Sequence, residues 1–181
     1  MFEKLSKKTG KVLDHFLDNP GEEFYLRQVA TILKISASTA KIALETLEKE
    51  GILKKESRAN ANFYSLNTES KKVTELKIAK NMDFITRSGI AQQIQEQNTS
   101  IISLVLFGSY AKGNNTKNSD IDILIISQKK ANYSTIDCEG VEVSIIQYTP
   151  QEWKEKAKKD KPFYQEIITT GKVLVGTLPV I

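Results

Sequence analysis

Two short and nearly uninterrupted apolar runs, at residues 101–107 and 121–126, constrain the fold of this chain more than any other feature. Runs of this length and composition are typical of strands that are buried on both faces of a sheet. Up to about residue 98, by contrast, apolar residues recur mainly at helical spacing, apart from a short β-like interval. Because the apolar period changes there, we expect an α+β protein with a first domain at 1–68, a connecting helix at 69–80 and a second domain at 81–181.

The first domain is predicted to contain three helices followed by a β-hairpin. We expect the helices at 10–18, 25–33 and 37–50, the third of them capped by a serine that precedes or opens it. The two strands, at 52–56 and 62–66, flank a short polar link. This is a compact helical unit that ends in a hairpin.

The second domain is predicted to combine a mixed sheet with helices on its flanks. The helical stretch before the first apolar run is expected to break near Ser88 and Gly89. A third strand is expected at 141–148, and Thr149-Pro150 marks the start of a helix, since an N-cap is followed there by proline. Another helix at 162–171 and a last strand at 172–175 complete the expected elements.

The composition excludes several classes of protein. With 26 Lys and Arg against 22 Asp and Glu and a pI near 9.0, the chain is mildly basic, which permits nucleic-acid binding without requiring it. A single cysteine, Cys138, excludes an internal disulfide, and a single histidine, His15, leaves no Cys/His cluster for structural zinc. The charged N-terminus lacks a signal core, and no apolar stretch is long enough to span a membrane. We therefore expect a cytoplasmic protein without a membrane segment.

The segment from the end of the first apolar run to the start of the second contains the residues that could bind a ligand or take part in a reaction. Gly108 allows a phosphate to approach the backbone, Ser109 supplies a hydroxyl and an amide, and the helix that follows offers free N–H groups to an anion. Asp120 and Asp122 lie two residues apart at the start of a strand, so both carboxylates point to one face, which we expect to lie close to the Gly-Ser turn. Paired carboxylate oxygens suit Mg²⁺ or Mn²⁺, with triphosphate oxygens completing the coordination. The sequence therefore predicts a site for a nucleoside triphosphate and a divalent metal.

The runs GSYAKG at 108–113 and SDIDILI at 119–125 closely resemble the signature of the DNA polymerase β-like nucleotidyltransferase superfamily, especially its minimal branch. With the flanking elements, the resemblance spans about 81–176. It implies that Gly108 and Ser109 hold the triphosphate and that the two aspartates bind metal. Lys112 occupies the position of the motif's frequent basic residue, where it would contact the nucleotide; the alternative is an exposed loop lysine.

The same resemblance implies a third carboxylate on the strand after the Asp-x-Asp strand, and here the sequence departs from the family pattern. The corresponding position holds Ser144, whereas Glu142 lies two residues earlier on the same predicted strand face. We therefore predict Glu142 as the third catalytic and metal-binding carboxylate, with an exposed strand residue as the alternative. Loss of this carboxylate would affect turnover but not nucleotide binding.

Residues 25–66 resemble winged helix-turn-helix domains in the order and spacing of their elements. The resemblance implies binding of double-stranded DNA, with the third helix in the major groove and the hairpin against phosphates or in the minor groove. We expect a homodimer on a palindromic site, because a monomer with so small a positive charge would bind weakly. The alternative is a dimerisation or docking module. The residues expected at the DNA are Ser38, Thr39, Lys41, Ile42, Lys54, Arg58 and Asn60.

Three functions are consistent with these features. The first is an enzyme that transfers a nucleoside monophosphate from a triphosphate to a hydroxyl acceptor and is localised or regulated by DNA binding. The second is a transcriptional regulator whose nucleotidyltransferase domain binds nucleotide with weak or no activity, as Ser144 would favour. The third is an antitoxin-like protein that is paired with a helical, toxin-like partner, as minimal nucleotidyltransferases of this kind often are.

Overall fold

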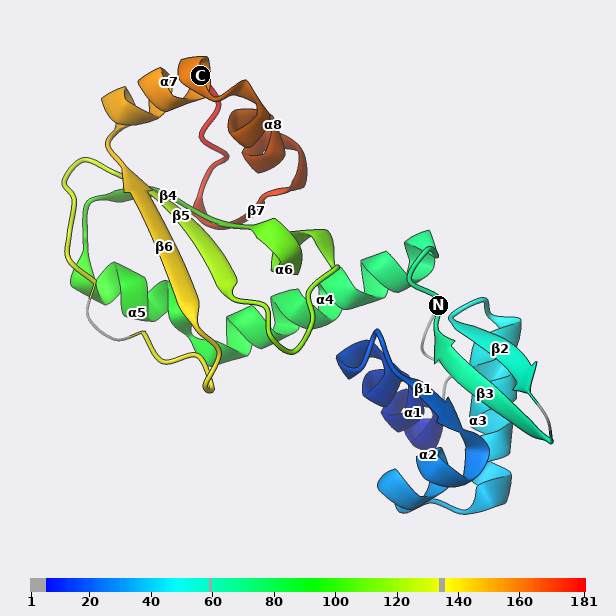
Figure 1. Cartoon of the computed structure of the whole chain (residues 1–181). Helices are drawn as coiled ribbons and strands as arrows, with labels where there is room; N and C mark the ends of the chain where they lie inside the picture. Colours follow the sequence, from blue (N-terminus) through cyan, green and yellow to red (C-terminus); the bar gives the residue numbers. More distant parts are fainter. Residues whose placement is uncertain (1–5, 59, 134–135) are drawn as a thin grey trace. The chain divides into compact units, whose positions relative to one another are not determined.

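The computed structural model describes residues 6–58, 60–133 and 136–181, and the chain forms two compact units, Met1–Glu75 and Leu76–Ile181 (Figure 1). The boundary between the units falls within a single long helix. No helix in the described part of the chain combines the length and the apolarity that crossing a membrane requires.

The first unit contains three helices and a three-stranded antiparallel sheet in the order β1-β3-β2. The predicted hairpin is confirmed, and it pairs in register from Leu53↔Leu66 to Arg58↔Ala61. The strand β1 was not predicted, because three residues are too few to show a period, and the second helix accordingly begins at Leu26. The elements of this unit are α1 (Lys7–Asp18), β1 (Glu23–Tyr25), α2 (Leu26–Ile32), α3 (Ala37–Lys49), β2 (Leu53–Arg58) and β3 (Ala61–Leu66).

Residues at both ends of α3 and along its buried face explain why this helix forms. The Ser36 hydroxyl accepts a hydrogen bond from the Thr39 N–H at 3.1 Å and thereby caps the first turn. Gly51 follows the helix with a φ of +69°, a left-handed conformation that glycine adopts without strain. The face at helical spacing is fully buried, and it consists of Ala40, Ala43, Leu44 and Leu47.

The second unit is built around a four-stranded mixed sheet in the order β6-β5-β4-β7, in which only β5 and β6 are parallel. The α+β class with a mixed sheet between helices is therefore confirmed for this unit. Its elements are α4 (Lys71–Ser88, beginning in the first unit), α5 (Ile90–Gln97), β4 (Ile101–Phe107), α6 (Gly108–Lys112), β5 (Ile121–Ser127), β6 (Val143–Tyr148), α7 (Pro150–Lys159), α8 (Lys161–Thr170) and β7 (Lys172–Gly176).

Two boundaries in this unit differ from the prediction. The helix expected at 69–80 continues as α4 to Ser88, and only then does the expected break occur, at Gly89 with a φ of +67°. The third strand begins at Val143, two residues later than expected. Glu142 therefore immediately precedes β6, although its carbonyl still accepts a hydrogen bond from the Ile121 N–H of β5.

The sheet separates two apolar cores, because α4 and α5 cover one face while α7 and α8 cover the other (Figure 1). Alternate residues of β5 point to opposite faces. Ile121 and Ile123 pack in the core on the α4 and α5 side, whereas Leu124 and Ile126 pack in the core that includes Ile167 of α8. By this alternation Asp122 lies on the face of the sheet that α7 and α8 cover.

Candidate functional site

The end of β4 and the start of β5 bring the Gly-Ser turn against one aspartate. Phe107 and Asp122 are paired across the two strands, and Gly108 follows with a φ of +67°. A Cβ atom placed on Gly108 would lie only 2.1 Å from Oδ2 of Asp122, so only glycine fits beside this carboxylate. The structure therefore places Asp122 directly at the predicted phosphate cradle.

The short helix α6 begins at this point and ends at Gly113, whose φ of +74° and N–H bond to the Ser109 carbonyl close its last turn. Ser109 is half-buried, and its hydroxyl makes no hydrogen bond to another described residue. Its position at the first turn of α6 leaves the hydroxyl available to a ligand.

The two aspartates form an electrostatically strained pair. Burial raises the pKa of Asp122 above its ordinary value, and the negative charges of Asp120 and Glu166 raise it further, while the Lys112 ammonium acts in the opposite direction. Asp120 itself is exposed and immediately precedes β5. A nearby cation would stabilise the negative charges of these carboxylates.

Sequence reasoning missed one member of this cluster, Glu166 of α8. Its Oε1 lies 2.6 Å from Nζ of Lys112, the last residue of α6, and both side chains are partly buried. Lys112 is therefore neither an isolated nor a fully exposed loop lysine in this structure. No local signal marks Glu166, since its contact with Lys112 arises only when α8 packs on the sheet.

The position beside Asp122 on the neighbouring strand holds a hydroxyl. The parallel register pairs Asp122 of β5 with Ser144 of β6. Glu142 lies before the strand with an exposed side chain, and its carbonyl accepts a hydrogen bond from the Ile121 N–H at 2.9 Å. Within the described ranges, no three His, Cys, Asp or Glu side chains gather closely enough to hold a metal ion.

A buried polar network from α4 holds the loop between α6 and β5. The Asn81 amide donates to the Tyr110 carbonyl and to Oδ1 of Asn115, each at 2.8 Å. Nζ of Lys77 donates to the Asn115 carbonyl. Lys77 and Asn81 are 5% and 6% exposed, respectively, so these bonds are shielded from water. The loop that leads to Asp120 is thus tied to α4.

The residues predicted to contact DNA lie on two surfaces of the first unit. Ser38, Thr39, Lys41 and Ile42 lie on α3, where Ile42 is 64% exposed. Lys54 and Arg58 lie on β2, and Asn60 lies in the turn beyond it.

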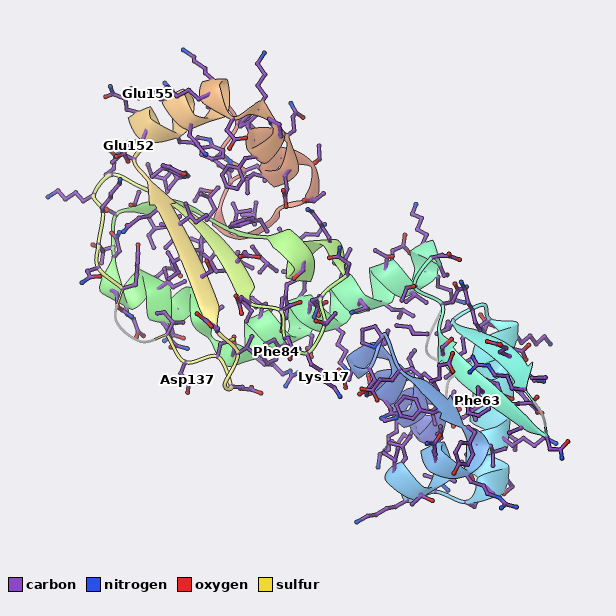
Figure 2. All side chains as sticks on the ribbon, viewed as in Figure 1. Phe63, Phe84, Lys117, Asp137, Glu152 and Glu155 are labelled. Atoms are coloured by element: carbon purple, nitrogen blue, oxygen red, sulfur yellow. The ribbon has the colours of Figure 1, made fainter. Side chains whose placement is uncertain are left out.

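Three of the cations on these surfaces already have carboxylate partners. Lys54 lies 2.6 Å from Glu69, and Lys41 lies 3.8 Å from Glu45. Arg58 binds Glu23 at 2.7 Å and Glu56 at 2.6 Å, and its guanidinium lies 5.3 Å from the ring centroid of Phe63, which is labelled on the hairpin in Figure 2. These ion pairs are exposed, so a phosphate can compete with them.

Comparison with known proteins identifies the class of the second unit. Residues 89–178 match the family described as "Polymerase beta, Nucleotidyltransferase". These residues are therefore similar to that family, and the mixed sheet between helices of the second unit fits a nucleotidyltransferase fold. No curated protein matches the chain.

Solved structures with weak similarity include a possible transcriptional regulator from Methanosarcina mazei Go1, which is 19% identical, with 52% of this chain and 80% of that chain covered and a TM-score of 0.36. A mutant form of the toxin–antitoxin MntA–HpeT is 21% identical, with 49% and 71% covered and a TM-score of 0.34. HmgR from Pseudomonas aeruginosa is 16% identical, with 76% and 53% covered and a TM-score of 0.32. At such low similarity these structures say nothing about the function of this chain.

Proposed function

We propose that the second unit is a divalent-metal-dependent nucleotidyltransferase that transfers a nucleoside monophosphate from a nucleoside triphosphate to a hydroxyl acceptor. The observation that carries the proposal is the contact between Asp122 and Gly108, since it joins a metal-binding carboxylate to a backbone that a phosphate can approach. The family match of residues 89–178 supports the same class of reaction.

The donor set suits Mg²⁺ or Mn²⁺. Asp120 and Asp122 offer hard carboxylate oxygens, and Asp122 carries an ionisation cost that a cation would relieve, because burial and Asp120 raise its pKa. These two residues would hold the metal, which when bound shields the negative charge of the triphosphate and aligns the α-phosphate for attack.

The remaining residues would bind and orient the nucleotide. Gly108 brings the backbone directly against the Asp122 carboxylate, where a phosphate would lie beside the bound metal, and Ser109 offers its hydroxyl and its N–H. Lys112 would contribute the positive charge on this side of the cradle. Glu142 is the candidate for the acceptor side, because Ser144 at the neighbouring strand position cannot act as a carboxylate.

The test is transfer of a labelled nucleotide. Incubation with α-labelled ATP and Mg²⁺, alone and with cell lysate, should label an acceptor. Asp120→Ala and Asp122→Ala should each reduce labelling by about 100-fold or more. This loss exceeds the effect of substituting a residue that only supports a metal ligand, which is about 10- to 100-fold. Glu155→Ala is the matched control, since Glu155 is an exposed carboxylate on α7 (Figure 2). Labelling that survives both aspartate substitutions would overturn the assignment of the site.

A second candidate function is a regulator or antitoxin-like protein that binds nucleotide with weak or no turnover, alone or with a helical, toxin-like partner. The observation that favours it is that Ser144, rather than a carboxylate, is paired with Asp122 across β5 and β6. Binding of MgATP without transfer to any acceptor would support this function. If transfer does occur, Glu142→Ala decides its role: a large fall in rate with unchanged nucleotide affinity would make Glu142 the third carboxylate.

We also propose that the first unit binds double-stranded DNA as a winged helix, in a homodimer. Support comes from the order of its elements, with the capped helix α3 directly followed by the hairpin of β2 and β3. The exposed face of α3 has the size and polarity for a major groove, and Ile42 is the residue suited to contact thymine methyl groups.

Binding to duplex DNA tests this proposal by fluorescence anisotropy at several salt concentrations. We expect the logarithm of the affinity to fall linearly with the logarithm of the salt concentration, and Lys41→Ala to weaken binding and to lower the slope by about 1. Lys71→Ala is a matched control, because both lysines pair with a glutamate four residues later on an exposed helix. A salt-independent affinity would contradict phosphate contacts.

A further inference from the structure

The ion pair of Lys112 and Glu166 links two helices of the second unit. It joins α6 to α8, whereas several of the other ion pairs connect residues four apart on one exposed helix. Its side chains are 38% and 31% exposed, which is close to 34% and 38% for Lys156 and Asp160 and well below 90% and 65% for Lys71 and Glu75. The pair is therefore held in a defined, partly desolvated place rather than on a freely solvated surface.

The pair of Lys112 and Glu166 lies at the proposed nucleotide site. Lys112 ends the helix that Gly108 begins, and the Gly108 backbone lies against Asp122. Glu166 and Lys112 both act electrostatically on Asp122, with opposite signs. Their charges therefore reach the same space that the triphosphate would enter.

The charges around the cradle indicate which ion pair a bound triphosphate would replace. The local groups are the carboxylates of Asp120, Asp122 and Glu166 and the single ammonium of Lys112. A divalent metal can offset the two aspartates, and Glu166 then remains as the carboxylate that neutralises Lys112. Since an ammonium prefers a multiply charged phosphate group to one carboxylate of similar exposure, the triphosphate and Glu166 compete for Lys112.

We propose that Glu166 is a positioning residue of the nucleotide site, which holds Lys112 beside the Gly108 cradle and is replaced by the triphosphate as the partner of Lys112. This inference rests on the proposed function, because it requires that the cradle binds a nucleoside triphosphate. It adds a residue on α8 to a site that is otherwise formed by the turn after β4 and the start of β5.

The affinity for MgATP should rise when the charge of Glu166 is removed. Glu166→Gln removes the competing charge and keeps the size of the side chain, so MgATP should bind about three- to tenfold more tightly, toward the lower end of the coupling expected for residues in direct contact because the pair is partly exposed. The gain should require Lys112: in the Lys112→Met background, Glu166→Gln should change the dissociation constant by less than about twofold. A merely structural role for the pair would not produce tighter binding in one background and no change in the other.

The experiment is a double-mutant cycle measured by isothermal titration with MgATP and with Mg²⁺ alone, on the full chain. Asp83→Asn serves as a matched control, since Asp83 pairs with Arg87 in the same unit but does not act on Asp122. Thermal unfolding of every variant checks that the fold is retained, and Glu166→Asp, which keeps the carboxylate, should bind MgATP with nearly the original affinity.

The outcomes separate the two proposals. If the unsubstituted protein binds MgATP and Glu166→Gln leaves or weakens the affinity, or if the gain persists with Lys112→Met, the role of Glu166 is wrong and the proposed function stands. If the unsubstituted protein binds no MgATP, the proposed function fails and the inference fails with it.

Discussion

Asp122 is an ionisable side chain in a place that disfavours its charge. Its pKa is raised by burial and by the carboxylates of Asp120 and Glu166, so the folded protein binds the Asp122 proton more tightly than the unfolded chain does. The stability that this proton contributes is complete below the unfolded pKa, near 4, and is lost as the pH rises through the raised pKa of the folded state. At neutral pH the metal-free fold therefore carries an uncompensated cost, as functional sites commonly do.

We predict that Asp122→Asn stabilises the metal-free second unit at pH 7.5, because the amide has the shape of the carboxylate without its charge. The gain should lie near the lower end of about 0.5–2 kcal/mol, since Asp122 is partly exposed, and it should raise the melting temperature by a few degrees. Thermal unfolding with a chelator, followed between pH 7.5 and pH 4, measures the difference, which should shrink toward the acidic end.

The exposed Asp137, labelled in Figure 2, provides the comparison, and Asp137→Asn should leave the melting temperature nearly unchanged. Millimolar Mg²⁺ should stabilise the unsubstituted protein and have little effect on the Asp122→Asn protein, because a ligand stabilises the state that binds it. A lower melting temperature for Asp122→Asn at neutral pH would show that this carboxylate is not strained.

Among the elements, α4 does more than connect the two units. Its residues Lys77 and Asn81 are buried polar groups that bond to the α6 carbonyl of Tyr110 and to both oxygens of Asn115. An Asn amide nitrogen has two donors, and both are used here. The helix thereby fixes the loop whose far end carries Asp120.

We predict that Asn81→Ala destabilises the second unit by about 1–3 kcal/mol, because it removes the donor to the Tyr110 carbonyl in a buried bond and to the partly buried Oδ1 of Asn115. It should also weaken MgATP binding, as α6 and the loop lose their attachment. Thermal unfolding and nucleotide titration measure the two effects. Thr86→Ala on the same helix removes an exposed hydroxyl that binds only the Met82 carbonyl, and equal behaviour of the two variants would exclude the positioning role of Asn81.

Helices and strands were predictable from the sequence where residues close together in the chain determine them. The apolar runs gave β4 and β5, and the capping box of Thr149 and Glu152 with Pro150 accounts for the confirmed start of α7. The closeness of Asp122 to the Gly-Ser turn followed from the two strands that carry them.

Contacts between distant segments were not predictable in this way. Glu166 reaches Lys112 only because α8 packs on the sheet, and the burial of Lys77 contradicts the usual exposure of lysine. The register pairs Ser144 with Asp122, and the strand expected at 141–148 begins only at Val143, so the role of Glu142 stays a prediction.

At the scale of the whole molecule, the family match and the compact unit do not begin at the same residue. The match covers 89–178, whereas the second unit begins at Leu76 and includes most of α4. Ile85 of α4 is 2% exposed and belongs to the core under the sheet, and Met82 and Phe84 pack against that core. The folding unit of the nucleotidyltransferase domain therefore includes a helix outside the matched residues.

We predict that a fragment of residues 70–181 folds with nearly the melting temperature of the second unit in the full chain, while a fragment of 89–181 does not fold cooperatively. The shorter fragment loses the buried Ile85, whose burial alone contributes about 1.5–3 kcal/mol, and also the hydrogen bonds of Lys77 and Asn81 to the loop before β5. These losses together are comparable with the total stability of about 5–15 kcal/mol that a domain possesses. Circular dichroism and amide exchange on both fragments measure the outcome, and a cooperative transition in 89–181 at the temperature seen for 70–181 would show that α4 only connects the units.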